Sequence, residues 1–394
     1  MPSTIVWNIA PELFTKGFLN LRWYNLLFAT GVLGGIPIWY HMFAKAGKTR
    51  EEADKIKGYV VLSVLVGARL GHVIFYEWHY YQDHLLEIFL PVVFSPKFKI
   101  TGFSGLASHG AAIGIVLAVF LYVKRITLSL FPPCIRFKNR RSAGEFLWLA
   151  DHIVILAALG GAMIRIGNFM NSEIIGKPTG SNYGVVFVRE LHDDLRKKHD
   201  STIESVVISK ASSTNMPPIK ANYQPIKLTI SFKETLQDEK MIKNFLAQSL
   251  KNHLVQEAYF NSSPKIYETY GTPLSYTLHK KDQGYQADVY TWGIPRHPAQ
   301  LYESFSCILI FITLFLWWKR KGQTLAPGRI FGTFMIILFS LRFFYEFYKE
   351  NQVEFENNMS LNMGQWLSLP WAIVGLFLIL RRHPKTVPQK MQNK

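Results

Sequence analysis

Residues 160–178 read Gly160-Gly-Ala-Met-Ile-Arg-Ile-Gly-Asn-Phe-Met-Asn-Ser-Glu-Ile-Ile-Gly-Lys-Pro178, and this stretch decides the fold class. It closes an apolar helix predicted over residues 146–169 and gathers polar side chains near its end. Arg165 lies inside this helix, where a central arginine costs about 2.5–3.5 kcal/mol if the surroundings are lipid. Asn168 follows three residues later, so both side chains project from one face. An arginine at this depth indicates a membrane helix with a functional site or a buried partner.

Further segments of the chain are also long and apolar enough to cross a bilayer, which takes roughly 20 residues of helix. The composition agrees, because 49% of the residues are hydrophobic and only 18% are charged, against about 25% charged in soluble proteins. The first segment lacks the pattern of a cleavable signal peptide, so we expect it to remain as a helix. The predicted spans cover residues 21–43, 59–77, 105–123, 146–169, 298–318, 329–348 and 365–381.

The net charge of +17 lies largely in the short loops that follow the first, third, fifth and seventh spans. Because Lys and Arg in short loops stay on the cytoplasmic side, this asymmetry predicts an outer N-terminus and a cytoplasmic C-terminus. The charge is thus a topology signal and argues against a nucleic-acid partner. The cations of these loops include Lys45, Lys48, Lys124, Lys319, Arg320, Arg381, Arg382 and Lys385.

One long polar stretch, residues 186–290, separates the fourth and fifth spans and lies outside by this orientation. Alternation of apolar and polar residues predicts strands at 227–233 and 275–279, and residues 239–250 have helical spacing. We therefore expect an all-α polytopic membrane protein, a bundle of seven transmembrane helices with a small inserted α+β extracytoplasmic head domain. The expected division is 1–185 (helices 1–4 and most of the ligand site), 186–290 (head) and 291–394 (helices 5–7 and cytoplasmic tail).

Two other predicted spans also contain an arginine, Arg69 in the second and Arg342 in the sixth. Three unpaired central arginines would together cost about 8–10 kcal/mol, so they need partners or a purpose. Glu346 lies four residues after Arg342 on the same helical face, which makes internal pairing one explanation. For three arginines in different helices we favour a shared anionic ligand, because the guanidinium fork suits phosphate and stays charged.

Several polar residues lie at the outer ends of predicted spans, and each has a plain structural explanation. A helix end that meets water, with Gly176 as part of a stop signal, accounts for Glu173. His109 opens the third span, where a lone histidine is more often a structural hydrogen-bonding group than a catalyst. Tyr24 opens the first span and fits the aromatic belt of a membrane interface. The segment 297–303 is unusually polar for lipid, so some of its side chains should face the bundle interior.

Glycines recur at four-residue spacing in three of the predicted spans. Such pairs let helices approach closely, and we expect them to be packing features. The two cysteines, Cys134 and Cys307, are too few for a disulfide framework, and zinc-ligand spacing is absent, so no metal site is expected. The glycine pairs are Gly31 and Gly35, Gly67 and Gly71, and Gly110 and Gly114.

Taken in order along the chain, these motifs resemble the bacterial prolipoprotein diacylglyceryl transferases. The two more specific motifs are Arg165–Glu173 and His297–Glu303, whereas the glycine-rich pieces are weak separately. The chain departs from the usual family pattern at Asn25, at Ala111 and at Lys349, the last a position often held by Arg. The matching pieces are Trp23-Tyr24, Gly67–Gly71, His109-Gly110, Asp151, Arg165–Glu173, His297–Glu303, Arg342–Glu346 and Met363–Pro370.

The resemblance implies an enzyme of the bacterial cytoplasmic (inner) membrane, with its active site toward the outer face. The family transfers the diacylglyceryl group of phosphatidylglycerol to the lipobox cysteine thiol of secreted prolipoproteins. A thioether forms and glycerol phosphate leaves, which is the first step of lipoprotein maturation. The implied partners are phosphatidylglycerol, prolipoprotein signal peptides with a lipobox cysteine, and membrane lipids, without a cofactor.

Two steps of this reaction need help from the protein. A thiol is only slightly ionised at pH 7, so a base should accept its proton. The departing phosphate gains charge, which preorganised cations stabilise. We expect arginines on the phosphate, amide and phenol donors on the headgroup, and a carboxylate that orients an arginine. The expected catalytic residues are His109, Arg342, Tyr24 and Glu346, and the expected phosphatidylglycerol-binding residues are Arg165, Asn168, Glu173 and Gly176.

Two other classes of protein remain open from the residues alone. A secondary transporter of an organic anion could also use intramembrane arginines, but it predicts internal repeat symmetry, and the neighbourhoods of Arg165 and Arg342 do not match each other. A noncatalytic membrane scaffold with a receptor-like head would leave Arg165, Asn168 and Arg342 unexplained.

Overall fold

The computed structural model describes most of the chain. Residues 105–106 of the third predicted span, and Arg382 and Lys385 of the predicted tail, lie outside the described residues. The described residues are 4–16, 19–90, 92–93, 99–100, 107–130, 133–139, 143–212, 216, 222–281, 284–322, 324–351, 356 and 359–381.

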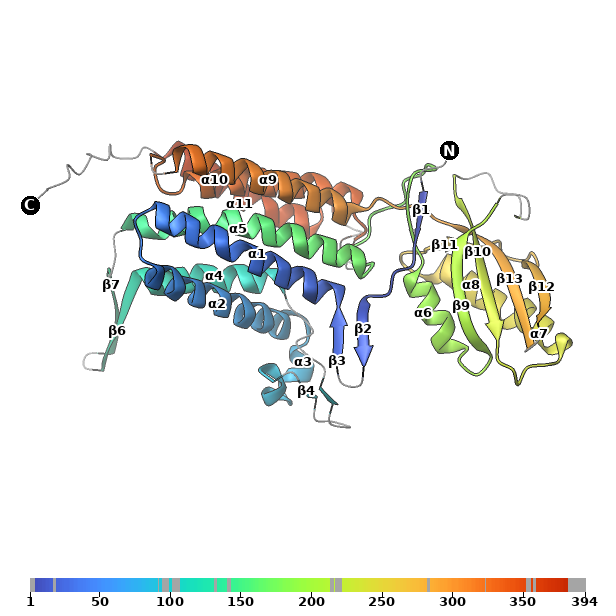
Figure 1. Ribbon diagram of the computed structural model, residues 1–394. Coiled ribbons are helices and arrows are strands. Elements are labelled where there is room, and N and C mark those ends of the chain that lie inside the picture. The colour runs from blue at the N-terminus through green and yellow to red at the C-terminus, as the bar shows by residue number, and fades with distance from the viewer. Residues whose placement is uncertain are drawn as a thin grey trace, which may run out of the picture.

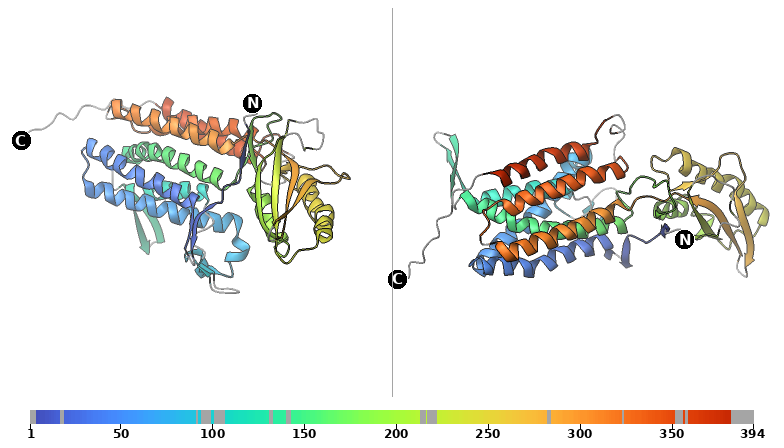
Figure 2. Two further views of the ribbon diagram at one scale, coloured as in Figure 1. Left: turned by 45° about the vertical axis from the view of Figure 1, so that its right-hand side comes forward. Right: turned by 90° about the horizontal axis from the view of Figure 1, so that it is seen from above.

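Apolar helices lie side by side in a bundle, and a sheet with its own short helices lies beyond one end of that bundle (Figures 1 and 2). Local caps fix some of the helix starts. The hydroxyl of Thr49 accepts from the backbone N–H of Glu52, and Asn362 and Gln365 form a capping box. The bundle helices are α1 (Trp23–Lys45), α2 (Arg50–Tyr76), α4 (Ser108–Val123), α5 (Ala143–Met170), α9 (Ala299–Lys321), α10 (Arg329–Tyr345) and α11 (Met363–Leu380).

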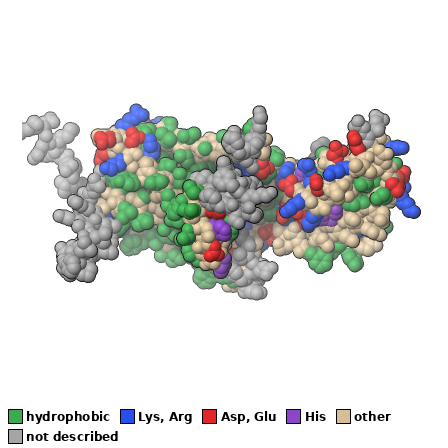
Figure 3. Space-filling view, turned by 90° about the horizontal axis from the view of Figure 1, so that it is seen from below, with side chains coloured by type: hydrophobic (Ala, Val, Ile, Leu, Met, Phe, Trp, Pro, Cys, Tyr) green, Lys and Arg blue, Asp and Glu red, His purple; other side chains and the backbone are tan. Residues whose placement is uncertain are grey.

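Six of the described helices, all but α4 in the bundle, are long and apolar enough to cross a membrane. Hydrophobic side chains cover the face of the bundle seen in Figure 3, and Leu62, Ile113 and Phe377 are each at least 60% exposed. The chain is therefore a mostly helical, polytopic membrane protein. Helix α4 has 16 residues, so it is about 24 Å long against a hydrocarbon core of roughly 30 Å. Whether α4 makes a seventh crossing stays a prediction.

The glycine pairs pack helices together as predicted. Gly67 and Gly71 of α2 lie against Gly110 of α4, and a Cβ atom on Gly71 would lie 2.7 Å from the Cα atom of Gly110. Gly31 and Gly35 of α1 lie against side chains of α5. Between α2 and α4 a Cβ atom would clash with backbone atoms, so this approach requires glycine, whereas Gly31 and Gly35 let α1 pack on side chains of α5.

Asp151 of α5 fixes the start of α10. Its carboxylate accepts from the backbone N–H groups of Gly328 and Phe331, each at 2.7 Å. Gly328 has φ 95°, which favours glycine at this turn. The carboxylate thus satisfies N–H groups that a helix start leaves without partners.

The sheet lies at the far end of the molecule from the paired strands β6 (Lys124–Leu130) and β7 (Pro133–Asn139) (Figure 1). Its strand order is β11-β13-β10-β9, with β12 paired to β13, and all of these pairs are antiparallel. Strand β10 contains the alternating segment 227–233 up to Phe232, and its residues alternate between buried and half-buried. The elements are α6 (Arg189–Lys198), β9 (Ile203–Lys210), β10 (Gln224–Phe232), α7 (Glu239–Phe245), η3 (Leu246–Leu250), α8 (Lys251–Phe260), β11 (Ile266–Tyr267), β12 (Ser275–Lys281) and β13 (Gly284–Gly293).

Several short elements complete the fold, and apart from η4, which lies within the predicted span 329–348, the sequence did not predict them as helices or strands. Strand β1 pairs in parallel with β8, so the N-terminal segment joins the chain that follows α5. Short hairpin strands carry only weak local signals, because their register depends on partners elsewhere. These elements are β1 (Thr4–Trp7), β2 (Glu12–Lys16), β3 (Leu19–Arg22), α3 (Trp78–Tyr81), η1 (Leu85–Ile88), β4 (Val92–Val93), β5 (Lys99–Ile100), β6 (Lys124–Leu130), β7 (Pro133–Asn139), β8 (Gly184–Phe187) and η4 (Glu346–Tyr348).

Candidate active site

Polar side chains at the end of α5 form a hydrogen-bonded line that begins at Arg165. The Arg165 guanidinium donates to Asn168 Oδ1 at 3.3 Å, and Asn168 Nδ2 donates to Glu173 Oε2 at 3.2 Å. Asn171 Nδ2 donates to the other oxygen of Glu173 at 3.0 Å. The three-residue spacing of Arg165 and Asn168 brings them together as predicted. Glu173 is therefore a hydrogen-bonded member of this line as well as the end of a helix.

The turn that carries Glu173 has an unusual backbone. Ser172 and Ile174, its two neighbours, have φ values of 55° and 54°, a region that residues other than glycine seldom occupy. Gln300 Nε2 holds the turn by donating to the carbonyl oxygen of Glu173 at 2.5 Å. Backbone strain of this kind persists where surrounding contacts enforce it, and it concentrates at functional sites.

Five charged side chains from α5, α9, α10 and the segment after α10 alternate in sign. Glu303 forms ion pairs with both Arg165 and Lys349. Lys349 Nζ also donates to Glu346 Oε1 at 2.9 Å, and Arg342 Nε lies 3.8 Å from the same oxygen. We call this set the charge chain. Its members in order are Arg165, Glu303, Lys349, Glu346 and Arg342.

The middle of the charge chain is buried, whereas its two ends are open. Lys349 is 3% exposed, while the side chains of Arg165 and Arg342 are 24% and 41% exposed. Three cations and two carboxylates leave a net charge of +1. Arg342 Nε makes no hydrogen bond to any residue that the structure describes. Because a buried donor without a partner is costly, the site is suited to an anion at the Arg342 end.

Helix α11 supports the carboxylate of Glu346. Asn362 Nδ2 donates to Glu346 Oε2 at 3.4 Å, just before α11 begins. A Cβ atom on Gly364 would lie 2.5 Å from Glu346 Cδ, so a larger residue here would push the Glu346 carboxylate away from the helix start. The predicted pairing of Arg342 with Glu346 is present, and α11 fixes the carboxylate that orients the arginine.

Comparison with known proteins identifies the family of the chain. The family described as prolipoprotein diacylglyceryl transferase matches residues 11–381. The chain belongs to this family. Relatives named phosphatidylglycerol–prolipoprotein diacylglyceryl transferase are 27% identical in Bacteroides fragilis, over 95% of this chain and 94% of the relative, and 28% identical in Tolumonas auensis, over 95% and 96%. One in Porphyromonas gingivalis is 28% identical over 99% of both chains.

Family membership makes the protein a transferase. The remaining expected site residues, Tyr24, His109 and Gly176, lie at different places relative to the charge chain. Tyr24 of α1 packs on Gly167, where a Cβ atom would lie 2.8 Å from Tyr24 Cδ2. The Tyr24 hydroxyl is also within electrostatic reach of Glu173 and Arg165. Tyr24 is thus brought to the α5 end of the site.

His109, the expected base of the transferase, is exposed at the start of α4. Its ring contacts the rings of Phe75 and Tyr76 of α2, with centroids 5.0 and 5.8 Å apart. Among the described residues, the His109 ring contacts these two rings, and neither of them belongs to the charge chain. The structure therefore places His109 on the α2–α4 side of the transferase.

Gly176 allows a close backbone approach, as expected, but the approach is to other parts of the protein. Its N–H donates to the His297 carbonyl at 3.1 Å, and its own carbonyl accepts from Arg296 at 3.1 Å. A Cβ atom on Gly176 would lie 2.8 Å from the carbonyl oxygen of Tyr348. Gly176 thus joins the segments that carry Glu303 and Lys349.

The prediction of an anionic ligand shared by three arginines is wrong for Arg69. Its guanidinium donates to the carbonyls of Glu87 and Ile88, each at 2.8 Å, and to the Tyr81 hydroxyl at 3.0 Å. Arg69 is 7% exposed and is satisfied by the segment that follows α2. Backbone carbonyls are effective acceptors for a buried guanidinium, so no ligand is needed to explain it.

Sequence reasoning did not assign Glu303 or Lys349 to the site. The polar segment 297–303 predicted that some side chains face the interior, and Glu303 does so. Lys349 was noted only as a position that often holds Arg. Charge balance could have indicated Glu303, since buried arginines in different helices need nearby carboxylates. Lys349 then follows as the cation that two buried carboxylates share.

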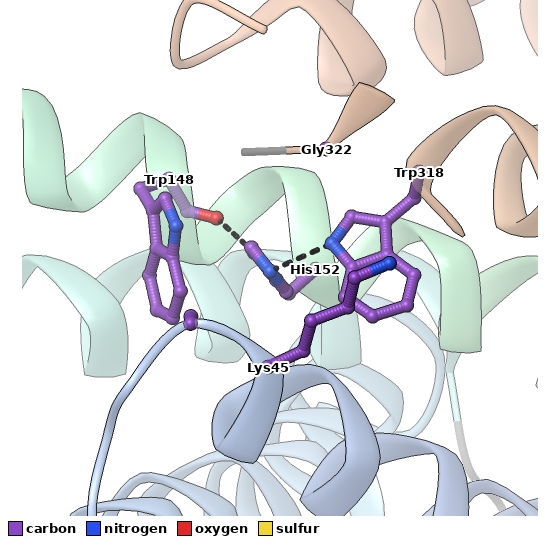
Figure 4. A pocket seen from close by; sticks show the side chains of 6 residues that line it. Lys45, Trp148, His152, Trp318 and Gly322 are labelled. Atoms are coloured by element: carbon purple, nitrogen blue, oxygen red, sulfur yellow. Dashed lines mark hydrogen bonds between the residues drawn. The ribbon is translucent and has the colours of Figure 1, made fainter. Parts of the chain in front are cut away.

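A separate small cavity lies at the other end of the bundle (Figure 4). It has a volume of about 30 Å³ and lies beside His152, whose ring bonds to the Trp148 carbonyl at 2.7 Å and to Trp318 Nε1 at 3.2 Å. Lys45 covers the Trp318 ring at 5.1 Å. A space of this size holds about one or two waters, so we regard it as a packing defect of the transferase.

Proposed function

We propose that the chain transfers the diacylglyceryl group of phosphatidylglycerol to the lipobox cysteine thiol of secreted prolipoproteins. The sulfur forms a bond to the glycerol carbon that carries the phosphate. The carbon–oxygen bond at that carbon breaks, and glycerol phosphate leaves with the electron pair. The names of the relatives support the two substrates, and the charge chain supports the chemistry.

The observation that carries the proposal is the open Arg342 end of the charge chain. The Arg342 side chain is 41% exposed, and its buried Nε has no hydrogen-bond partner among the described residues, although it pairs with the Glu346 carboxylate at 3.8 Å. A phosphodiester with one negative charge would neutralise the net charge of +1. As the leaving oxygen gains charge, a preorganised guanidinium stabilises it more than it stabilises the ground state.

Arg165 acts on the same phosphate from the α5 side. Glu303 already holds one face of its guanidinium, and Asn168 accepts at another position. The two contacts fix the orientation of Arg165 before the lipid binds, which lowers the entropy lost on binding. Asn168 and Tyr24 then donate hydrogen bonds to the headgroup, and Glu173 and Gly176 form the outer wall.

The thiol belongs to the substrate in this proposal, since Cys307, the cysteine whose side chain the structure describes, is buried within α9. His109 is the proposed base for its proton. The precursor would then approach from the side where α2 and α4 meet, while the lipid phosphate lies at the charge chain. In this proposal, attack and departure take place on opposite sides of the glycerol carbon, as displacement requires.

The proposed membrane placement follows the loop charges. The N-terminus lies outside and the C-terminus in the cytoplasm of a bacterial inner membrane, with α4 as the seventh span. Residues 186–290 then form the extracytoplasmic head, between the membrane parts 1–185 and 291–394. The active site faces outward, on the same side as the head.

Mass measurement of a lipobox peptide tests this function. The purified protein is incubated with phosphatidylglycerol and the peptide, with a Cys-to-Ser peptide and with phosphatidylethanolamine as matched controls. We expect a mass increase of one diacylglyceryl group only with phosphatidylglycerol and the thiol. An unmodified peptide together with flux of an organic anion into proteoliposomes would favour a transporter instead.

A further inference from the structure

A short segment projects sideways from the bundle directly after α2. It comprises residues 78–90, which include α3 and η1, and we call it the lateral arm. In Figure 1 it lies beside α2 at the end of the bundle nearer the sheet. Since the bundle axis is the direction of membrane crossing, a sideways projection at a helix end runs along the membrane surface.

One face of the lateral arm is fixed to α2. Arg69 donates to the Glu87 and Ile88 carbonyls and to the Tyr81 hydroxyl, at 2.8–3.0 Å. Tyr81 and Ile88 are buried together with Val73 of α2. The arm is therefore attached by three hydrogen bonds and a small apolar cluster, and the buried Arg69 is the centre of that attachment.

The opposite face of the lateral arm is apolar and open. Leu85, Leu86 and Phe89 are 59%, 70% and 61% exposed, and Trp78 is 47% exposed. Three large apolar side chains exposed within five residues indicate an interaction surface rather than a face in contact with water. The arm contains no Lys or Arg, so its partner must be apolar rather than anionic.

The apolar face continues the lipid-facing surface of a membrane span. Ile74, Phe75 and Tyr76, the last residues of α2, are 55%, 65% and 67% exposed. Helix α2 is long and apolar enough to cross a membrane, so we infer that these exposed apolar side chains face lipid. Trp78 and Tyr80 come next, and such aromatic residues gather where hydrocarbon gives way to headgroups. Lipid is thus the partner that the neighbouring surface already has.

We propose that the lateral arm lies in the membrane interface and inserts Leu85, Leu86 and Phe89 among the acyl chains. Arg69 holds the arm at this depth from within the protein. The partner is the bilayer itself, recognised by apolar contact, so insertion should not depend on anionic lipid or on salt. The inference does not depend on the proposed reaction.

A depth measurement on the full chain in nanodiscs tests the proposal. Cys134 and Cys307 are replaced by Ala, and a fluorescent label is attached through Leu86→Cys. The matched control is Met241→Cys in α7, where the side chain is similarly exposed at 59%. Helix α7 belongs to the sheet unit, the sheet of β9–β13 with helices α6–α8. We expect lipids brominated near the acyl carbonyls to quench the Leu86 label several-fold more strongly than the Met241 label.

Two outcomes would overturn the proposal. One is equal quenching of the two labels. The other is a Leu86 label that stays in water until a precursor peptide or a second copy of the chain is added, which would make the arm a protein-docking surface. In phosphatidylcholine alone and in high salt, the strong quenching should persist.

The role of Arg69 has its own test. Arg69→Gln should increase the mobility of a spin label at residue 86, because the guanidinium contacts to Glu87 and Ile88 are lost. Arg50→Gln, at the other end of α2, should leave that mobility unchanged. Unaltered mobility in a folded Arg69→Gln variant would contradict the anchoring role and leave the depth measurement as the test of insertion.

Discussion

Lys349 and Glu303 form an ion pair that is almost fully withdrawn from solvent, with side-chain exposures of 3% and 9%. They come from the segment after α10 and from α9, so the pair joins two parts of the chain far apart in sequence. Lys349 also contacts Glu346, which faces Arg342. One ammonium group therefore holds the carboxylates that position both arginines.

Replacing Lys349 by Met should abolish transfer and destabilise the protein by about 3–5 kcal/mol, because two buried carboxylates would lose their shared cation. Lys349→Arg should keep most of the activity, because it keeps a positive charge between the two carboxylates at a position that often holds Arg in the family. Thermal unfolding in detergent and kcat/KM for a lipobox peptide measure the two effects. Normal activity of a folded Lys349→Met variant would show that the charge chain is not needed.

Arg342→Gln should lower kcat for transfer by about 10²–10³, because a preorganised donor to the leaving phosphate is lost. Arg165→Gln should lower kcat less than Arg342→Gln does and should raise KM, because the Arg165 guanidinium is already ion-paired with Glu303. Arg329→Gln is the matched control, an exposed arginine at the other end of α10. Near-normal kcat/KM in both site variants would rule out their action on phosphate.

Sequence reasoning reached the part of the site that local spacing determines. Arg165 with Asn168, and Arg342 with Glu346, each lie within one turn of a single helix, so periodicity alone brings them together. The role of the glycine pairs could also be predicted, because glycines four residues apart lie on one helix face and allow close helix packing. These features depend on one helix or on its immediate neighbour.

The remaining features depend on contacts between distant segments. Glu303 and Lys349 meet only after α5, α9 and α10 have packed together, and no spacing in the sequence records that contact. Arg69 was misjudged for the same reason, since its acceptors lie in a segment whose fold back onto α2 has no periodic signal. The family resemblance supplied residue roles, whereas the pairing of charges required the three-dimensional arrangement.

Asp151→Ala should destabilise the protein by about 1–3 kcal/mol, because the N–H groups of Gly328 and Phe331 would lose their charged acceptor. Activity per folded molecule should stay normal. Asp151 lies fourteen residues before Arg165 in α5, which is about 21 Å along the helix. Thermal unfolding and kcat/KM of this variant are compared with those of Thr324→Ala, a substitution at an exposed residue in the loop between α9 and α10. A catalytic defect without lost stability would contradict this structural role.

The sheet unit should lose stability in acid through His253. Burial lowers the pKa of the His253 imidazole to about 4, and the nearby Lys198 and His199 act in the same direction. The unfolded chain then binds more protons below pH 6.5, so stability present above that pH is lost as the pH falls toward 4. We expect a loss of about 1–2 kcal/mol over this range, reduced by solvent screening of the neighbouring charges.

Hydrogen exchange of β10 and β13 amides in the full chain, corrected for intrinsic rates, measures this loss. His253→Gln should flatten the pH dependence, whereas His279→Gln, an exposed histidine on β12, should not. An unchanged pH slope in His253→Gln would assign the acid sensitivity to another group.

His109 is the expected base, and its ring packs against Phe75 and Tyr76. Its test must therefore separate proton transfer from packing. His109→Gln should slow transfer to a cysteine peptide, because the thiol loses its proton acceptor. A selenocysteine peptide is already ionised near neutral pH and needs no base, so the variant should recover most of its rate with that peptide. His72→Gln, on neighbouring α2, should behave as wild type with both peptides. An equal defect of His109→Gln with both nucleophiles would mean that His109 serves through its contacts with Phe75 and Tyr76, and the base would have to be sought nearer the charge chain.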